Sequence, residues 1–234
     1  MKHLILALTL SLLPSLASFP PEYATLLEKY VNSSGVDYEG LYHNNEDQQK
    51  LQIAVDYYAK GAIPEDPKEA LSWHLNAYNA WIIKKIIDKY PTKGPISGGD
   101  LLFFRKKSIK IAGKKTSFDK LEQKVIRPVY QESRIHFALN CASTSCPPLR
   151  NEPYIASKLN AQLNEQAEKF INQNTQGLQV SKTGVHLSKI FEWYADDFGG
   201  KDNLMTWINH YKSPQLPLDS NVQFLKYDWT LNSQ

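Results

Sequence analysis

Residues 134–150 read RIHFALNCASTSCPPLR and hold both cysteines of the chain, a histidine, an asparagine and two adjacent prolines. Apolar side chains alternate with polar or small ones from Ile135 to Asn140, which is the period of a β-strand. The Ser/Thr-rich CASTSC that follows, closed by Pro147 and Pro148, is typical of a turn. The pattern predicts a buried strand that delivers Cys141 to a tight loop.

The clearest helix predicted in the chain covers residues 67–90. Asp66 suits the N-cap, Pro67 suits the first helical position, and a second proline follows at the end. Asn76 and Asn79 fall on the apolar face of this helix, and a buried amide without partners costs about 1 to 3 kcal/mol. We expect both amides to fix loop backbone, with ligand binding as the alternative.

The remaining elements are predicted from shorter apolar patterns. Helices are expected at residues 23–31, 47–60, 117–127, 154–172, 188–198 and 201–212, hairpins at 109–117 and 178–187, and a closing strand at 224–231. Neither an internal repeat nor a long linker occurs. We therefore expect one mainly helical α+β domain over residues 18–234. Its small, mostly antiparallel sheet would contain the hairpins, the 135–140 strand and the closing strand.

The N-terminus has the pattern of a secretory signal peptide. Lys2 precedes an apolar run from Leu4 to Leu16, and the small residues Ser15 and Ala17 suit a cleavage site after Ala17. The run is too short for a transmembrane helix, and no later run is apolar enough for one. The mature chain of about 217 residues is expected to be a periplasmic or secreted protein without a transmembrane segment.

The charge pattern argues against nucleic acid as a partner. The chain has 27 basic and 24 acidic residues, well mixed, and a formal net charge of +3. The basic cluster at 105–115 is interpreted as the charged edge of a hairpin rather than a site for an anionic partner. The expected partner is a cell-envelope ligand or protein.

The two cysteines suggest a disulfide. In an exported chain, Cys141 and Cys146 would most simply pair, and closing so short a loop stabilises a protein by about 2 kcal/mol. A metal site would use the same cysteines with His136, but the spacing matches no common zinc pattern. The sequence contains no phosphate-cradling glycine loop, GxSxG or HExxH motif, so we expect neither a metal nor another cofactor.

Glu122 is the acidic residue with the clearest chemical interest. It falls on the inward face of the helix predicted at residues 117–127, where a carboxylate is either paired with arginine or poised as an acid or base. Arg127 and Arg134 are the candidate partners. We expect Glu122 to lie close to Arg134 at the start of the predicted strand, because neither charge is tolerated alone beside apolar neighbours. The pair would line the same cavity as His136.

Four motifs occur in a fixed order along the chain: HLNAYNAWIIKKI, SFDKLEQKVIRP, RIHFALNCASTSCPPLR and LSKIFEWYADDFG. Together they resemble the family called domain of unknown function 547, which is found in exported bacterial proteins and in plant proteins. The resemblance covers about residues 73–199, and VDYEGL and KYDWTLN are also similar to bacterial members. It brings no established reaction.

The resemblance marks individual positions. The plant members are similar to this chain at Cys141, carry serine at the place of Cys146 and lack a histidine at the place of His136. This implies that neither a disulfide nor a Cys141–His136 pair is common to the whole family. The positions that match the family pattern are Asn76, Asn79, Glu122, Arg134, His136, Asn140, Cys141, Pro147, Asp197 and Phe198.

Two functions of different classes follow from these residues. The preferred one is a non-catalytic binding or scaffold domain that presents CASTSCPPL as a disulfide-stapled loop, since no complete catalytic set can be named. The alternative is a cysteine-dependent amide hydrolase or acyl transferase that acts on cell-envelope material. Candidates for catalysis are Cys141, His136 and Glu122, and candidates for binding are Asn76, Asn79, Arg134 and Asn140.

The catalytic alternative meets one geometric objection. A thiol nucleophile needs a base within hydrogen-bond reach. In a straight strand His136 and Cys141 point to opposite faces, because they are five positions apart. The base would then depend on a bulge at Asn140, or would be His74, His186 or His210. A free thiol at Cys141 distinguishes the two functions, because a stapled loop has none.

Overall fold

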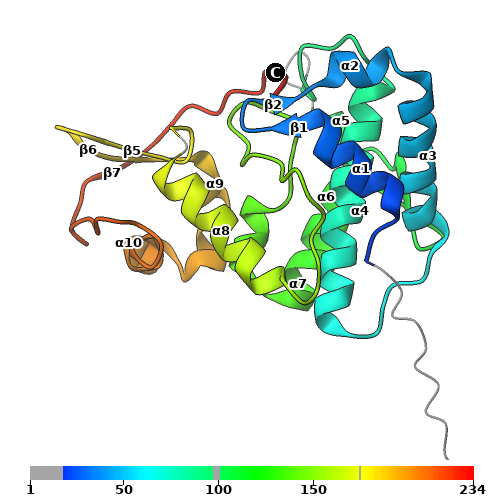
Figure 1. The fold of residues 1–234 in the computed structure, drawn as a ribbon. Helices are drawn as coiled ribbons and strands as arrows, with labels where there is room; N and C mark the ends of the chain where they lie inside the picture. Colours follow the sequence, from blue (N-terminus) through cyan, green and yellow to red (C-terminus); the bar gives the residue numbers. More distant parts are fainter. Residues whose placement is uncertain (1–17, 97–100, 174) are drawn as a thin grey trace, which may run out of the picture.

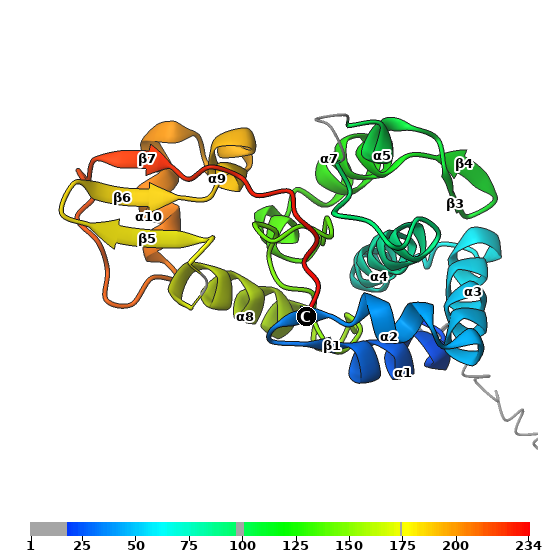
Figure 2. The ribbon, with the colours of Figure 1, turned by 90° about the horizontal axis from the view of Figure 1, so that it is seen from above.

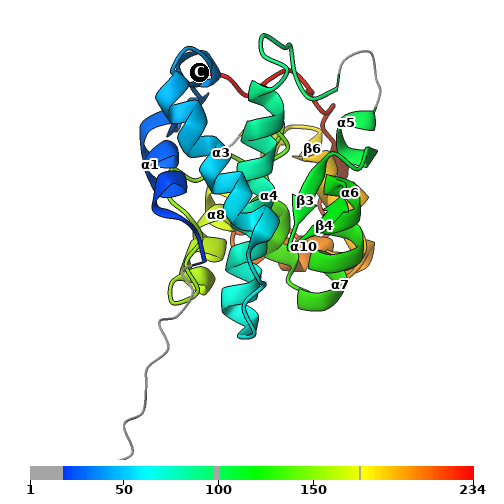
Figure 3. The same cartoon turned by 90° about the vertical axis from the view of Figure 1, so that its right-hand side faces the viewer.

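The computed structural model describes residues 18–96, 101–173 and 175–234, and the predicted signal peptide at residues 1–17 lies outside this part (Figure 1). The first described elements are helical: α1 (Pro21–Tyr30), α2 (Tyr38–Tyr42), α3 (Asn45–Lys60) and α4 (Pro67–Ile87), with a short hairpin of β1 (Val31–Asn32) and β2 (Gly35–Val36). Figure 3 shows α3 and α4 side by side. Among the described helices, none has the length and apolarity needed to cross a membrane.

Helix α4 confirms the clearest helix prediction. The Asp66 side chain accepts hydrogen bonds from the backbone N–H groups of Lys68 and Glu69, and Pro67 occupies the first turn. These contacts satisfy donors that have no partner within the helix. Most of α4 is buried. It forms the centre of the larger of two apolar cores, which also contains residues of α1, α2 and α3.

The middle of the chain consists of short elements. They are α5 (Leu102–Arg105), the hairpin of β3 (Ile109–Ile111) and β4 (Lys114–Thr116), α6 (Phe118–Leu121), a π-helical turn (Glu122–Ile126), α7 (Arg127–Tyr130) and a 3-10 turn (Ser133–Phe137). The hairpin was predicted, and its strands pair antiparallel with Ile109 opposite Thr116. Ser117 caps α6 by accepting a hydrogen bond from the Lys120 N–H.

The last part of the chain surrounds the second apolar core. Its elements are α8 (Leu159–Asn172), β5 (Leu178–Ser181), β6 (Gly184–Leu187), α9 (Lys189–Trp193), 3-10 turns at Ala195–Phe198 and Lys201–Asn203, α10 (Leu204–Asn209) and β7 (Val222–Phe224). Strands β5 and β6 form the predicted antiparallel hairpin, and β7 pairs parallel to β6. Figure 2 places this three-stranded sheet at the opposite end of the molecule from α3.

The predicted strand from Ile135 to Asn140 is wrong. Ser133–Phe137 form a 3-10 turn, in which the Glu132 side chain accepts the Arg134 N–H and the Ile135 carbonyl accepts the Ala138 N–H. All six side chains from Ile135 to Asn140 are nevertheless buried. The apolar alternation is therefore compatible with a compact turn that is covered on every side, so periodicity alone was a misleading signal here.

The fold class is α+β and mainly helical, as predicted, but the single predicted sheet is wrong. The described strands form three separate sheets, ordered β1-β2, β3-β4 and β5-β6-β7. The closing strand predicted for residues 224–231 is limited to β7, which ends at Phe224. The chain beyond it pairs with a loop instead of a sheet.

The C-terminal segment (residues 225–232) runs along the cysteine loop (residues 141–146). Ser143 and Leu231 form an isolated antiparallel bridge, and the Thr144 N–H donates to the Thr230 carbonyl over 2.8 Å. Figure 2 shows this red segment crossing between the two ends of the molecule. It brings the last residues of the chain to the loop that holds both cysteines.

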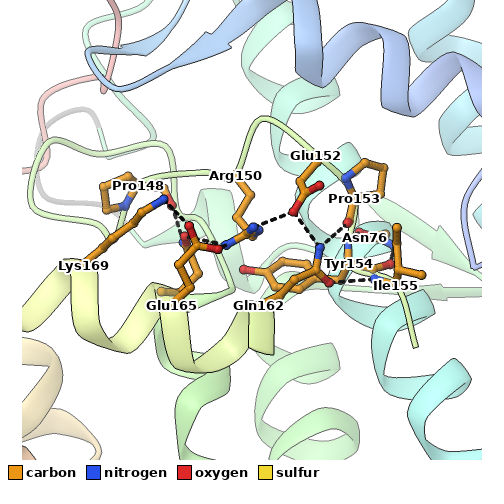
Figure 4. Close-up of polar contacts among 11 residues, drawn as sticks. Asn76, Pro148, Arg150, Glu152, Pro153, Tyr154, Ile155, Gln162, Glu165 and Lys169 are labelled. Carbon is orange, nitrogen blue, oxygen red and sulfur yellow. Dashed lines mark hydrogen bonds and ion pairs between the residues drawn. The ribbon is translucent and has the colours of Figure 1, made fainter. Parts of the chain in front are cut away.

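A second set of contacts fixes the chain that leaves the cysteine loop (Figure 4). The Arg150 guanidinium donates to Glu152 over 2.6 Å and to Glu165 of α8 over 2.8 Å. The Gln162 amide bonds the carbonyl of Pro153 and the N–H of Ile155. These contacts join residues 150–155 to α8 and so fix the chain that follows the cysteine loop, while the C-terminal segment is bonded to the loop itself.

Candidate active site

A cavity of about 240 Å³ lies beside the cysteine loop. Glu122, His136 and Cys141, the three catalytic candidates from the sequence, all line it. The described lining also contains Tyr78, Leu101, Phe104, Arg105, Asp119, Gln123, Leu139, Cys146, Ile190, Trp193, Tyr194, Tyr227 and Trp229. The cavity thus combines a thiol, an imidazole and a carboxyl group with aromatic walls.

His136 reaches this cavity because the strand is absent. In a straight strand it would point away from Cys141, whereas the 3-10 turn and the bend at the cysteine loop bring both side chains to the same cavity. Ala142 contributes to the bend with a left-handed φ of 58°. The objection that the two side chains point to opposite faces of a strand therefore does not apply, and among the described contacts the hydrogen-bond partners of the Cys141 thiol are Ser143 and Tyr227 rather than His136.

Asp197 fixes the orientation of the His136 ring. The His136 Nε2 lies 2.7 Å from the Asp197 carboxylate, and Arg127 donates to the same carboxylate over 2.7 and 2.8 Å. The hydrogen bonds with His136 and Arg127 hold the pKa of Asp197 well below its ordinary range. An ionised carboxylate only accepts hydrogen bonds, so Nε2 of His136 carries a proton and donates it to Asp197.

Tyr194 supports the same ring from its face. The His136 and Tyr194 rings stack with centroids 3.9 Å apart. The Arg127 guanidinium lies over the Tyr194 ring, 4.9 Å from its centroid. The His136 side chain is only 2% exposed. Its position is therefore set by packing as well as by the Asp197 hydrogen bond.

The Cys141 thiol has several polar partners. Its Sγ lies 3.0 Å from the Ser143 hydroxyl and 3.1 Å from the Tyr227 hydroxyl. Burial raises the pKa of Cys141, but hydrogen bonds with Cys146, Ser143 and Tyr227 outweigh burial and lower the pKa below its ordinary value. A lowered pKa increases the fraction of reactive thiolate near neutral pH.

Cys146 has a different environment from Cys141. It is buried, and its Sγ accepts the backbone N–H of Cys141 over 2.8 Å. Burial and the hydrogen bond with Cys141 raise the pKa of Cys146. Cys146 is therefore the less acidic of the two thiols, and its Sγ donates to the Leu139 carbonyl over 3.8 Å.

The predicted disulfide between Cys141 and Cys146 is not present, because both cysteines are free. The Cys146 sulfur receives the backbone N–H of Cys141, whereas the Cys141 sulfur is turned toward Ser143 and Tyr227. Cys141 is partly exposed and Cys146 is buried. The loop is thus held by hydrogen bonds, and the two sulfurs are not equivalent.

Glu122 faces the cavity, but its predicted pairing with Arg134 is wrong. Arg134 donates to Glu132 over 2.8 Å and to Asn164 of α8 over 2.6 Å. The 3-10 turn directs Arg134 to α8, so Arg134 is not among the charges that act on Glu122. Burial raises the pKa of Glu122 and outweighs the lowering effects of His136, Tyr194 and Arg127, and the nearby Asp119 adds to the rise. The carboxyl group is therefore a possible proton donor at a pH where an ordinary glutamate is ionised.

The predicted burial of Asn79 beside the cysteine loop is confirmed. Its amide donates to the Ala138 carbonyl and accepts the Asn140 N–H, both over 2.9 Å. The Asn140 side chain in turn bonds the Pro147 carbonyl over 3.0 Å and the Ala142 N–H over 2.8 Å. These two amides shape the cysteine loop from inside.

Asn76 makes the same kind of contact one helical turn away. It is bonded to the backbone N–H and carbonyl of Tyr154, each over 2.8 Å. The four residues proposed for binding do not belong to the described lining of the cavity: Asn76, Asn79, Arg134 and Asn140. Their polar groups serve contacts within the protein.

Sequence reasoning missed several residues that face the cavity or support it. Tyr227 and Trp229 come from the C-terminal segment, and Trp193 comes from α9, where its aromatic neighbours suggested only core packing. Arg127 was considered only as a partner for Glu122. The similarity of KYDWTLN and of the Asp197 position to family members was the signal that pointed to these parts of the chain.

Comparison with known proteins identifies the central part of the chain. Residues 65–171 match the family described as "Protein of unknown function, DUF547". No curated protein and no solved structure matches the chain. The matched range contains Glu122, His136 and Cys141, and Asp197 and Tyr227 lie beyond it. By this match, residues 65–171 belong to the DUF547 family, as the four motifs predicted.

Proposed function

We propose that the protein is a cysteine-dependent hydrolase or acyl transferase that acts on an amide or ester, with Cys141 as its nucleophile. One observation carries the proposal. A thiol with a lowered pKa and a histidine oriented by an aspartate line the same cavity. A nucleophile, a base and a group that orients the base are the parts that thiol-based acyl transfer needs.

The reaction proceeds in two steps. His136 takes the proton of the Cys141 thiol, the thiolate attacks the carbonyl carbon and forms a C–S bond, and the C–N or C–O bond breaks as the leaving group takes that proton from His136. His136 is the proposed proton donor and acceptor, and Asp197 keeps its ring oriented. In the second step water or an acceptor amine, deprotonated at His136, attacks the thioester and releases the Cys141 thiolate.

Two further groups have proposed roles. Tyr227 stabilises the thiolate through its hydroxyl, 3.1 Å from the sulfur. Glu122, whose pKa is raised by burial, is a second proton donor toward the leaving group. With the export signal predicted at residues 1–17, we propose a substrate in the cell envelope.

Trapping the thioester tests this proposal. The protein is incubated with a panel of simple acyl esters and amides, and intact-mass and peptide analysis locate any acyl group. Acylation of Cys141 in the parent, loss of it in Cys141→Ala and its accumulation in His136→Ala are expected. If the parent is never acylated at Cys141, or if Cys141→Ala turns over substrate equally well, the proposal fails.

The second candidate is a binding domain without catalysis. A specific observation favours it, since the cavity is walled largely by aromatic side chains that suit a ligand. The stapled loop on which the scaffold interpretation depended is absent, however, because both thiols are free. A ligand that binds Cys141→Ala and parent equally and is recovered unchanged from both would favour this candidate.

A further inference from the structure

An aromatic ledge (Trp193, Tyr227 and Trp229) forms one wall of the cavity. The Trp193 and Trp229 rings stack at an interplanar angle of 19° with centroids 6.0 Å apart. The Tyr227 ring packs against both, with centroid distances of 4.8 Å to Trp193 and 4.5 Å to Trp229. Two segments far apart in the sequence, α9 and the C-terminal segment, therefore build one continuous surface.

The ledge begins at the reactive sulfur. The Tyr227 hydroxyl lies 3.1 Å from Cys141 Sγ, and the ring of the same residue contacts both tryptophans. The Tyr227 side chain thus spans the space between the sulfur and the two indoles. Trp193 is 48% exposed, so part of the ledge is open to an incoming molecule.

The polar groups of the cavity are already bonded to one another. Gln123 bonds Glu122 and Arg127, and Glu122 also bonds Tyr194. His136 is bonded to Asp197. Few polar groups are thus left to bind several hydroxyl groups of a ligand. Covering the exposed aromatic faces with an apolar group, in contrast, contributes favourable binding free energy.

The charges at the cavity also favour a neutral group. Of the described lining residues, Arg105, Asp119, Glu122 and His136 can carry charge, and none of them belongs to the ledge. The ledge itself has only aromatic side chains. A charged acyl group would lose hydration there without a partner of opposite charge.

We propose that the aromatic ledge is the acyl-group subsite and that it takes a neutral, apolar acyl group bearing a ring. This inference rests on the proposed function, in which Cys141 carries the acyl group. A ring of this kind stacks on the indole faces while its carbonyl carbon is held at the sulfur. A small cavity of about 240 Å³ suits one such ring rather than a folded peptide.

Covalent labelling tests the subsite without requiring turnover. Three reagents with the same reactive group are compared: chloroacetamide, N-benzyl chloroacetamide and an N-glucosyl chloroacetamide. In each reaction the thiolate attacks the methylene carbon, a C–S bond forms and chloride leaves. Rate constants at Cys141, located by peptide mapping, are divided by those of free cysteine with the same reagent.

The benzyl reagent is expected to label the parent about tenfold faster than chloroacetamide after this correction, from one aromatic stacking contact and the area it buries. Trp193→Ala should reduce the ratio to near one, and Trp193→Phe should restore part of it. The matched control is Tyr42→Ala, because Tyr42 is an exposed aromatic residue that does not line the cavity. It should keep the full ratio.

The outcomes separate the two proposals. Three results would each overturn the subsite. They are the absence of a benzyl preference in the parent, a benzyl preference that persists in Trp193→Ala, and corrected labelling by the glucosyl reagent that is faster than labelling by the benzyl reagent. A Cys141 that reacts with chloroacetamide no faster than free cysteine near neutral pH would instead contradict an activated nucleophile. The benzyl ratio is measurable in either case, so the subsite is decided independently.

Discussion

Replacing Tyr227 by phenylalanine probes the activation of the thiol most directly. The change removes the hydroxyl that lies 3.1 Å from Cys141 Sγ and keeps the ring that packs against Trp193 and Trp229. Because this hydroxyl helps to lower the pKa of Cys141, the variant should have a higher thiol pKa. The direction of the change is fixed by the charge of the thiolate, which only accepts hydrogen bonds.

The size of the effect follows from the remaining partners. A hydrogen bond to a charged group contributes about 1.5 kcal/mol at the lower end of its range. The lower end applies here because the thiolate of the variant still has its hydrogen bonds with Ser143 and Cys146. This corresponds to about a tenfold smaller thiolate fraction below the pKa. A more basic thiolate is also more nucleophilic, with a Brønsted slope of about 0.5, so each thiolate reacts about threefold faster. The two effects together slow alkylation below the pKa by only about threefold.

The assay is the rate of alkylation by chloroacetamide as a function of pH. The variant should react about threefold more slowly than the parent below the pKa and about threefold faster well above it, so that the two profiles cross. Tyr211→Phe is the matched control, because the Tyr211 hydroxyl bonds Asn164 rather than the thiol. Profiles that coincide, or a slower reaction of Tyr227→Phe at every pH, would refute the proposed role of the hydroxyl.

Three further predictions concern stability and the two sulfurs. Asn79→Ala should lower the free energy of unfolding by about 1 to 3 kcal/mol, since the Ala138 carbonyl and Asn140 N–H lose their partner, and a melting temperature within a degree of the parent would contradict this. The depressed pKa of Asp197 contributes stability that is fully present above the ordinary aspartate pKa of about 3.9 and is lost as pH falls below that value. Chemical denaturation should therefore show that the difference in free energy of unfolding between the parent and Asp197→Asn decreases from pH 7 to about pH 3. Cys141→Ser should abolish chloroacetamide labelling and Cys146→Ser should keep it at a reduced rate, because only the first sulfur is the proposed nucleophile; equal losses of labelling in both would argue against it.

Local sequence signals predicted the elements whose structure is set locally. Helix α4 has its cap, its proline and its apolar length in one stretch, and the β3-β4 and β5-β6 hairpins have their turn residues between short apolar runs. The stretch from Ile135 to Asn140 failed because its burial comes from elements far away in the sequence. Period-2 alternation cannot distinguish a half-buried strand from a turn that is buried on all sides.

The candidate site was predicted in its residue types but not in its geometry. Glu122, His136 and Cys141 were named together, yet their approach depends on a 3-10 turn that the pattern did not indicate. Asp197 and Tyr227 lie 61 and 86 positions from their partners His136 and Cys141, so no local signal links them. The pairing of Glu122 with Arg134 failed for the opposite reason, because Arg134 pairs with a local partner, Glu132, only two residues before it.

The contact between the C-terminal segment and the cysteine loop has a consequence for the order of folding. Ser143 pairs with Leu231, and Val36 pairs with Ser233, so these bridges close very long loops. Long loops lose the most chain entropy on closure, and contacts of this kind form late. We expect the two apolar cores to fold first and the cavity to be completed last, when Tyr227 and Trp229 arrive. A protease cut near residue 225 should therefore leave a folded protein in which the Cys141 pKa is higher, because the Tyr227 hydrogen bond is lost.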